Sequence, residues 1–464
     1  MRRLARPAAP ATTLFARSRG AGSGINSTAM ARPPDRPAPP PTARAVAHEL
    51  LGAVLRRRRP LDELLAAHPG LAALSPRDRA FARKLLGTVL RRLGQIDRLI
   101  ADCLERPVPP RGAPAMEALR LGVAQLLFLD TPAHAAVDST VQLLSHGVAG
   151  YRGLVNAVLR RLDREGRERL AVLPAVPINT PAWLYERWSK AYGLETAAAI
   201  AAAHLEEPPL DLTVKSDPAT WAERMGARLL PTGSLRLRAE GPIEALPGFG
   251  EGGWWVQDAA AAIPARLLGE VAGRRVIDLC AAPGGKTAML AAAGAEVAAV
   301  DRSPTRLERL RQNLARLGLA AEIHEADATR WQPAEPADAV LLDAPCSSTG
   351  TIRRHPDLAW IKRPHEIATL ARLQDRLLTS AGRMVKPGGL LVYCTCSLEP
   401  EEGGERIAAF LANGAPFEPV PIEPAEVGGL GELLTPAGEL RSLPCHLAAE
   451  GGIDGFYAAR MRRR

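Results

Sequence analysis

The chain has 464 residues, a length typical of about three domains, and its 59 Lys and Arg against 50 Asp and Glu give a net charge of +9. Its most apolar stretch, residues 287–300, is too short to cross a membrane, and six cysteines are too few for a disulfide scaffold, which favours a cytoplasmic protein. The positive charge lies at the two ends, because residues 1–44 carry +7 and residues 460–464 carry +4, whereas the body between them carries 47 basic and 49 acidic side chains.

The first 42 residues are rich in Pro, Ala and Arg, a composition that cannot bury enough apolar surface to fold. They predict a disordered leader. Translated sequence upstream of a true start at Met30 is a second interpretation, and the scarcity of acids would also suit a mitochondrial transit peptide.

Residues 43–170 show helical periodicity. Val46, Leu50 and Val54 recur every four residues, and Ser75, three residues before Asp78, is a typical helix start. The pattern predicts an all-α domain of five or more helices.

The rest of the chain changes character twice. Residues 171–265 mix strand-like segments (211–215 and 234–237) with a helical one (218–226), which predicts a small α+β connector. In residues 266–464 short buried strands alternate with helices such as 305–317, which predicts an α/β Rossmann-like domain with a mostly parallel sheet. Its expected strands are residues 276–280, 296–300, 321–325, 339–342 and 390–394. Ligands of such sheets bind at the carboxyl ends of the strands.

A glycine-rich turn follows the first of these strands. Gly284 and Gly285 would let the backbone approach a ligand closely. The turn is not a P-loop, because Cys280 stands where that motif needs its first glycine, and the G-x-G-x-x-G of dinucleotide sites is absent. A generic strand-to-helix turn is the alternative.

Two acids follow the next two strands. Asp301 closes the second strand, where related folds bind ribose hydroxyls, and Asp327 follows the third, toward the adenine end of a nucleoside. A solvated aspartate at a strand end is an equally good interpretation of either residue.

Two cysteines, Cys346 and Cys396, follow the fourth and fifth strands among small polar residues, in the segments 343–350 and 393–402. Such neighbours predict exposed thiols, although a single cysteine is more often part of a core. The spacing of Cys394 and Cys396 is too tight for a zinc knuckle, and a disulfide is disfavoured in the cytosol.

These segments together resemble the RsmB/NOP (Sun/Fmu) family of S-adenosylmethionine-dependent RNA cytosine-C5 methyltransferases. The resemblance rests on residues 248–261, 281–287, 343–347, 395–397 and 454–458. Residues 132–138 and 153–160 are similar to the NusB-like RNA-binding domain, which accompanies the methyltransferase in the RsmB-type branch acting on 16S rRNA. Residues 213–215 depart from the family pattern, which leaves the connector's part in RNA contact open.

The resemblance implies a set of roles. Cys396 would be the nucleophile that adds to C6 of the cytosine, Cys346 would assist release, and Asp343 would contact either the base or the cofactor. Lys286 would orient the site, unless it is a solvated lysine at a helix start. The S-adenosylmethionine site would comprise Cys280, Ala281, Ala282, Pro283, Gly284, Gly285, Lys286, Asp301, Asp327 and Asp343, with no metal.

The expected partner is RNA, most specifically 16S rRNA, with no membrane and no protein partner implied. The target base would have to leave its stack to reach the site. Arg56–Arg59 and Arg91–Arg92 would supply basic surface for the RNA, or else form a solvated helix face. A cytosine in tRNA or in another rRNA is an alternative target, and a non-catalytic NusB-like adaptor is a more distant one.

Overall fold

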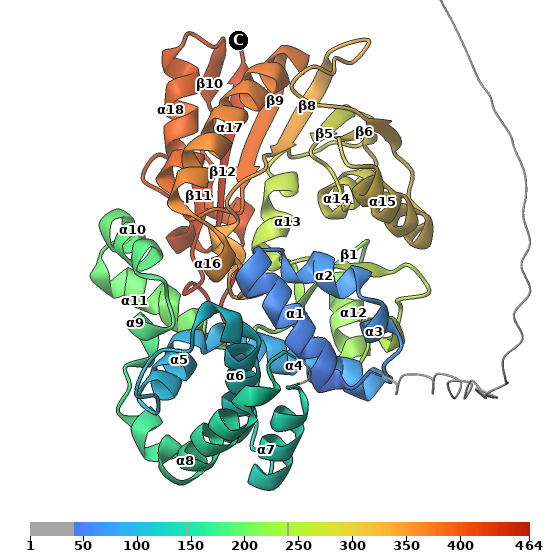
Figure 1. Ribbon diagram of the computed structural model, residues 1–464. Helices are drawn as coiled ribbons and strands as arrows, with labels where there is room; N and C mark the ends of the chain where they lie inside the picture. Colours follow the sequence, from blue (N-terminus) through green and yellow to red (C-terminus); the bar gives the residue numbers. More distant parts are fainter. Residues whose placement is uncertain (1–40, 145–146, 239–240) are drawn as a thin grey trace, which may run out of the picture. The chain divides into compact units, whose positions relative to one another are not determined.

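The computed structural model describes residues 41–144, 147–238 and 241–464 (Figure 1). The predicted leader, residues 1–42, therefore lies almost wholly outside the described residues. No helix in the described ranges is long and apolar enough to span a membrane.

The N-terminal part is all-helical, as the periodicity predicted. Ser75 caps the fourth helix, because its Oγ accepts the N–H of Asp78 at 3.1 Å. Leu119 and Val123 lie in α6, most of whose residues are buried. The helices are α1 (Ala43–Arg57), α2 (Leu61–Ala67), α3 (Pro69–Ala72), α4 (Pro76–Arg91), α5 (Leu93–Ala101), α6 (Ala113–Leu127), α7 (Ala133–Gln142) and α8 (Arg152–Ala171).

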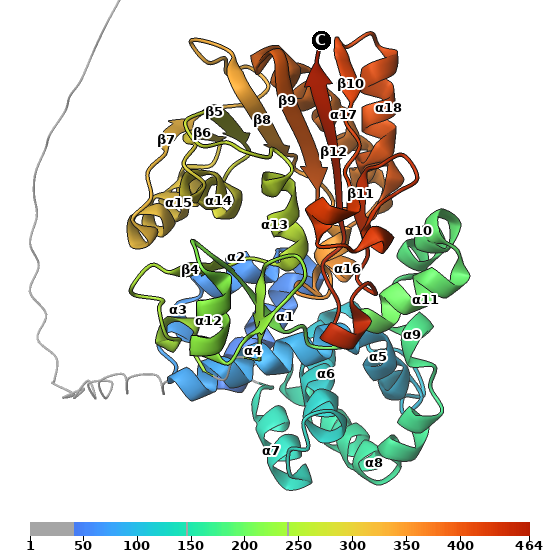
Figure 2. The same ribbon diagram turned by 180° about the vertical axis from the view of Figure 1, so that it is seen from behind.

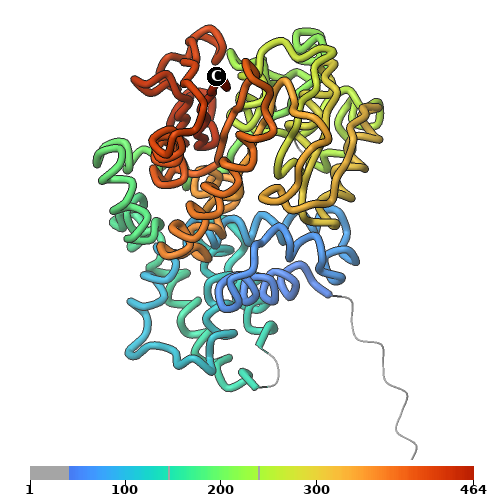
Figure 3. Tube along the Cα trace, turned by 90° about the horizontal axis from the view of Figure 1, so that it is seen from above, coloured from blue at the N-terminus to red at the C-terminus, as the bar shows by residue number. Residues whose placement is uncertain are grey.

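Three more helices follow, where the sequence analysis had already begun its connector. They are α9 (Ala175–Ile178), α10 (Ala182–Tyr192) and α11 (Leu194–Ala203). Leu184 and Trp188 of α10 are fully buried with Ile352 and Leu398, which belong to the C-terminal α/β part. Figures 1 and 3 accordingly show α10 and α11 beside the orange and red segments of the chain.

The connector contains an antiparallel sheet with the order β2-β3-β1-β4. Its strands are β1 (Leu210–Val214), β2 (Arg228–Leu229), β3 (Leu235–Leu237) and β4 (Trp254–Val256), and α12 (Pro218–Met225) packs against it. Figure 2 labels the strand β4 and the helix α12 of this segment. The two predicted strands and the predicted helix are confirmed within one residue at each end. Asp258 then caps α13 (Ala259–Arg266), which leads into the α/β part.

The C-terminal sheet has the order β10-β12-β9-β8-β5-β6-β7, with β11 paired to β12. The five predicted strands are present and mutually parallel: β5 (Arg275–Leu279), β6 (Glu296–Asp301), β7 (Glu322–Glu325), β8 (Ala337–Asp343) and β9 (Val385–Thr395). The chain returns antiparallel to β9 in β12 (Phe456–Arg463), whose other partners are β10 (Phe417–Pro419) and β11 (Leu440–Ser442).

Helices cover both faces of this sheet. Neighbouring residues of a strand point to opposite faces, so each face has its own set of core residues. Val276 of β5 packs with α13 and α14 (Gly285–Ala292), whereas Ile277 packs with α17 (Pro364–Met384) and α18 (Gly404–Ala412). A third cluster places α15 (Pro304–Leu317) beside α14. The strand order reverses between β5 and β8, which is the position where doubly wound sheets form their ligand crevice.

Candidate functional site

The candidate residues meet at the carboxyl ends of β5, β6, β8 and β9. Asp343 pairs in register with Cys394, and the N–H of Ala344 donates to the Cys394 carbonyl at 2.9 Å, so the loops after β8 and β9 leave the sheet side by side. Cys346 lies on the first loop and Cys396 on the second. The parallel arrangement thus brings together segments about 50 residues apart in the chain.

The two cysteine sulfurs are 3.4 Å apart, and both side chains are only partly buried. A hydrogen bond from the Cys346 thiol lowers the pKa of Cys396, whereas the same contact and burial raise the pKa of Cys346 well above its usual value. Cys396 is therefore the thiol that ionises first. A thiolate, and not a thiol, is the nucleophilic form of cysteine.

Lys286 and Asp343 form an ion pair at the same edge, with Nζ and Oδ2 2.7 Å apart. Burial of the ammonium is the largest single effect on the pKa of Lys286 and lowers it, but Asp343, Cys394 and Asp278 together outweigh it, and the net pKa is raised. Lys286 is 8 % exposed, so the alternative of a solvated lysine at a helix start is wrong. The thiol of Cys394 donates to the other oxygen of Asp343 at 3.5 Å, which fixes the carboxylate on both sides.

The glycine-rich turn runs from the end of β5 to the start of α14. Cys280 (φ +61°) and Gly284 (φ +103°) both adopt left-handed backbone conformations. A Cβ at Gly284 would lie 2.9 Å from the side chain of Leu310 on α15, so only glycine fits there. Burial raises the pKa of Cys280 well above its usual value. The backbone N–H groups at the start of α14 are of the kind that bind anionic groups of a ligand.

The two strand-end acids lie in different surroundings. Asp301 is only 3 % exposed, and its carboxylate accepts the N–H of Ala282 at 3.2 Å and that of Ser303 at 2.9 Å. Arg306 lies over it, with Nη1 3.6 Å from Oδ2. Asp327 is exposed, and hydrogen bonds from Thr329 lower the pKa of its carboxyl group. Asp301 thus ties β6 to the turn, and Asp327 is open to solvent.

Asp278 is a buried acid that the sequence analysis did not single out. It is the last but one residue of β5, and Thr287 Oγ1 donates to its Oδ2 at 2.6 Å. Its Oδ1 has no hydrogen-bond partner among the described residues. Burial raises the pKa of Asp278 to about 7. An acid in an otherwise apolar strand is the signal that could have identified it.

Polar residues that follow the two cysteines form a second buried cluster that the sequence analysis did not foresee. Ser347 and Ser397, each directly after its cysteine, have hydroxyl oxygens 3.0 Å apart. Both serines donate to the carboxylate of Glu402. Glu402 ends the segment 393–402 that was singled out for its cysteines, but only the fold shows that it reaches both loops.

The loop that continues from Cys346 contacts the N-terminal helices. Trp360 Nε1, on α16 (Leu358–Ile361), donates to the Leu90 carbonyl at 2.8 Å, and Arg91 donates to the Arg353 carbonyl at 2.6 Å. Arg91 is thus used in an internal contact and is not the RNA-facing or solvated arginine of the sequence analysis. Arg56 forms a 2.8 Å ion pair with the buried Glu117, but its own side chain is half exposed. Arg56–Arg59 are all exposed, so their predicted role as basic surface for RNA, or as a solvated helix face, stays a prediction.

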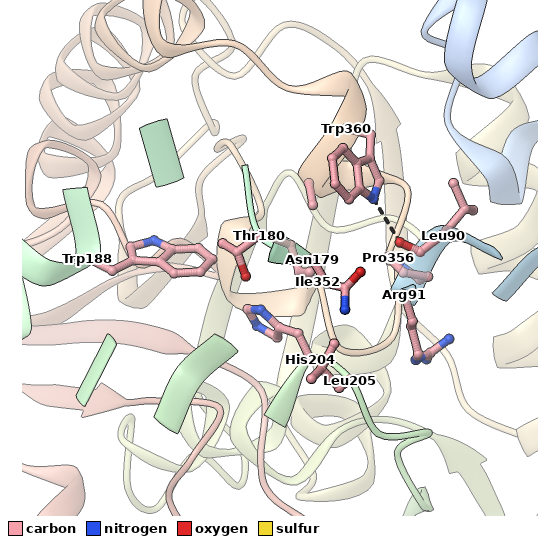
Figure 4. A pocket seen from close by; sticks show the side chains of 11 residues that line it. Leu90, Arg91, Asn179, Thr180, Trp188, His204, Leu205, Ile352, Pro356 and Trp360 are labelled. Atoms are coloured by element: carbon pink, nitrogen blue, oxygen red, sulfur yellow. Dashed lines mark hydrogen bonds between the residues drawn. The ribbon is translucent and has the colours of Figure 1, made fainter. Parts of the chain in front are cut away.

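A small cavity lies at this junction (Figure 4), and neither cysteine of the pair lines it. Its free volume of about 10 Å³ is room for one water molecule. Trp188, His204 and Trp360 are among its lining residues, and Nε2 of the buried His204 has no partner in the described chain. The described residues include no cluster of three or more His, Cys, Asp or Glu that could hold a metal ion.

Comparison with known proteins gives matches along most of the chain. A family model described as 16S rRNA methyltransferase RsmB/F matches residues 265–462, and one of the NusB family matches residues 41–164. Ribosomal RNA small subunit methyltransferase B of Klebsiella pneumoniae subsp. pneumoniae is 37% identical over 384 residues, which are 79% of this chain and 86% of the relative. The protein of the same name from Pseudomonas putida is 38% identical over 78% of this chain and 85% of its own length.

Solved structures share the fold. The crystal structure of PH0851 matches with a TM-score of 0.68 and 23% identity over 91% of this chain and 99% of its own. NSun6 from Pyrococcus horikoshii, solved with SFG, matches with a TM-score of 0.52 and 20% identity over 61% of this chain. At these identities the likeness extends to the architecture of the chain alone.

Proposed function

The chain belongs to the 16S rRNA methyltransferase RsmB/F family, and from that premise we propose which side chains perform each step of its reaction. It is an S-adenosylmethionine-dependent methyltransferase that modifies C5 of a cytosine in 16S rRNA. The single observation that carries the proposal is the pair of thiols 3.4 Å apart at the carboxyl ends of β8 and β9, one with a lowered and one with a raised pKa. The NusB-like helices are the RNA-binding part.

The residues around the glycine-rich turn suit S-adenosylmethionine. Residues 280–286 offer a close backbone approach and a helix N-terminus for its methionine end, and Asp327 offers an open carboxylate near the adenine end. Asp301 is assigned to the ribose, which requires Arg306 to turn away from the carboxylate it now covers. When bound, the cofactor supplies an electrophilic methyl group.

Cys396 performs the activating step. Cytosine C5 is too electron-poor to take a methyl group directly, so the Cys396 thiolate forms a bond to C6 and the electrons of the C5–C6 double bond become available at C5. C5 then takes the methyl group. A base removes the C5 proton, the C5–C6 double bond re-forms, and the C6–S bond breaks with its electron pair returning to sulfur. Cys346, whose thiol remains protonated next to Cys396, assists this release.

Asp343 and Lys286 position the base. Asp343 is about one-third exposed, and it ends β8 three residues before Cys346. A carboxylate at this place can accept from the exocyclic amino group of cytosine, and the ion pair with Lys286 holds it in position. We assign Asp343 to the cytosine in preference to the cofactor for this reason.

RNA is the proposed macromolecular partner, and the cytoplasm is the proposed compartment because a thiolate nucleophile needs reducing surroundings. The experiment is bisulfite sequencing of 16S rRNA from a strain lacking the gene, complemented with the wild-type chain or with Cys396→Ala. One cytosine of 16S rRNA should become sensitive to bisulfite deamination in the deletion strain. It should become resistant again only when the wild-type chain is supplied. An unchanged bisulfite pattern of 16S rRNA, together with a cytosine in tRNA that becomes sensitive in the deletion strain, would contradict the 16S assignment.

A further inference from the structure

Both catalytic loops converge on one buried carboxylate, that of Glu402, which is fully buried in the short helix η5 (Pro400–Glu402) after β9. Its Oε1 accepts the N–H of Ser347 at 2.9 Å, and its Oε2 accepts the hydroxyl groups of Ser347 and of Ser397, the latter at 2.6 Å. Ser347 follows Cys346 and Ser397 follows Cys396 in the chain. One side chain therefore binds the residue next to each thiol.

The contacts of Glu402 are those of a carboxylate held by neutral donors. Gln374 of α17 donates to Oε1 at 3.1 Å and, with the same amide nitrogen, to the Pro345 carbonyl at 2.9 Å. No Lys, Arg or His of the described chain forms an ion pair with Glu402. Burying a carboxyl group is costly unless hydrogen bonds satisfy it, and here four donor groups do so.

We propose that Glu402 is a positioning residue of the methyl-transfer reaction: it sets the distance between the Cys346 and Cys396 thiols by binding the serine that follows each of them. The inference rests on the proposed function, in which those thiols perform different steps. Glu402 touches neither substrate nor cofactor in this account. Its effect is on the geometry of the pair, and misplacing a reacting group by about 1 Å can cost roughly a hundredfold in rate.

The test compares Glu402→Gln with Glu401→Gln, the same substitution one residue earlier. Glu401 is a fair control because its carboxylate is partly exposed and pairs with Arg187, and its side chain forms no hydrogen bond with either serine in the described structure. In Glu402→Gln an amide NH₂ group, which is itself a donor, replaces one of the two acceptor oxygens. It then faces the N–H and hydroxyl donors that bind the carboxylate in the wild type. We expect kcat for methylation of 16S rRNA to fall about tenfold to a hundredfold, with the Kd for S-adenosylmethionine within twofold of wild type. The control should stay within twofold in both.

A second readout separates positioning from loss of fold. The hydrogen bond from Cys346 lowers the pKa of Cys396, so a wider pair should move the pH midpoint of Cys396 alkylation by iodoacetamide upward in Glu402→Gln only. Equal kcat values and equal midpoints for the two variants would overturn the inference. A parallel loss of kcat and of cofactor affinity would also overturn it, because that pattern indicates a general structural role.

Should Glu402→Gln fail to fold, Ser397→Ala provides the same test with a smaller change. It removes the hydroxyl that donates to Glu402 at 2.6 Å and should lower kcat at least threefold with cofactor affinity retained; an unchanged kcat would overturn the inference. Wild type and Cys396→Ala in the same assay report on the proposed function independently. An inactive wild type would refute that function, whereas an active Glu402→Gln refutes the role of Glu402 alone.

Discussion

Two identical side chains perform different tasks at this site because their surroundings differ. Cys396 receives a hydrogen bond from Cys346, which stabilises its thiolate, while Cys346 is held as the neutral thiol. Lys286 and Asp343 likewise form an ion pair of 2.7 Å, although the lysine is almost fully buried. At the residue scale, the chemistry is thus decided by neighbours that are distant in the chain.

His204 gives a residue-scale prediction of pH-dependent stability. Burial, with Arg353 and Arg91 nearby, lowers its pKa from 6.5 to about 3. The unfolded chain therefore binds a proton below pH 6.5 that the folded chain does not, so the free energy of unfolding falls as the pH drops from about 6.5 toward 3. Between pH 7 and pH 5 this one group should cost about 2 kcal/mol.

Urea unfolding of the wild type and of His204→Gln at pH 7 and pH 5 measures this cost. Glutamine does not titrate, so the variant should lose about 2 kcal/mol less than the wild type over that interval. The comparison cancels the contribution of the other titrating groups. Equal losses in the two proteins would mean that His204 is protonated in the folded state or accessible to water.

At the scale of elements, helix α16 connects the N-terminal helices to the loop of Cys346. Ile361 is buried in the N-terminal helical core, and Trp360 packs against it and hydrogen-bonds Leu90. Trp360→Ala should therefore destabilise the protein by about 2–4 kcal/mol and lower kcat, whereas Trp360→Phe, which keeps most of the packing, should cost about 1 kcal/mol. Thermal unfolding and methylation kinetics of both variants check this; full activity in a destabilised Trp360→Ala would show that α16 does not support the site.

Local patterns predicted most elements because their signals are short-range. The five parallel strands and the cap at Ser75 were predicted correctly. The start of β9 was not: the strand begins at Val385, five residues before its predicted start. Its first residues were missed because they include Pro387 and two glycines, which are typical of turns. Helices α9 and α10 were missed since prolines precede each of them, and proline indicates a break as readily as a helix start.

The site residues, too, fall into those that local motifs predicted and those that they did not. The turn and both cysteines were predicted from motifs, and the structure brings them to one edge of the sheet. Glu402 and Arg91 could not be assigned, because their roles depend on contacts 55 and 262 residues away. Whether a given arginine faces RNA or another domain is decided by tertiary packing, which neither charge counts nor periodicity reports.

At the scale of the whole molecule, the net charge of +9 says little about RNA binding. Residues 45–459 are close to neutral, and Arg91 is used in an internal contact, whereas Arg56–Arg59 are exposed. The helical part instead contacts the loop that carries Cys346, so RNA binding and the catalytic loop share one structural connection. The account therefore depends on the two cysteines more than on any general electrostatic attraction.

The most direct measurement traps the covalent intermediate. Cys346→Ala is incubated with S-adenosylmethionine and transcribed 16S rRNA and then run on a denaturing gel. The account predicts a slow-migrating, protease-sensitive RNA–protein adduct in Cys346→Ala, because bond formation by Cys396 is retained and release is impaired, and no adduct in Cys346→Ala/Cys396→Ala. Normal turnover of Cys346→Ala without an adduct, or an adduct that persists when Cys396 is removed, would contradict it.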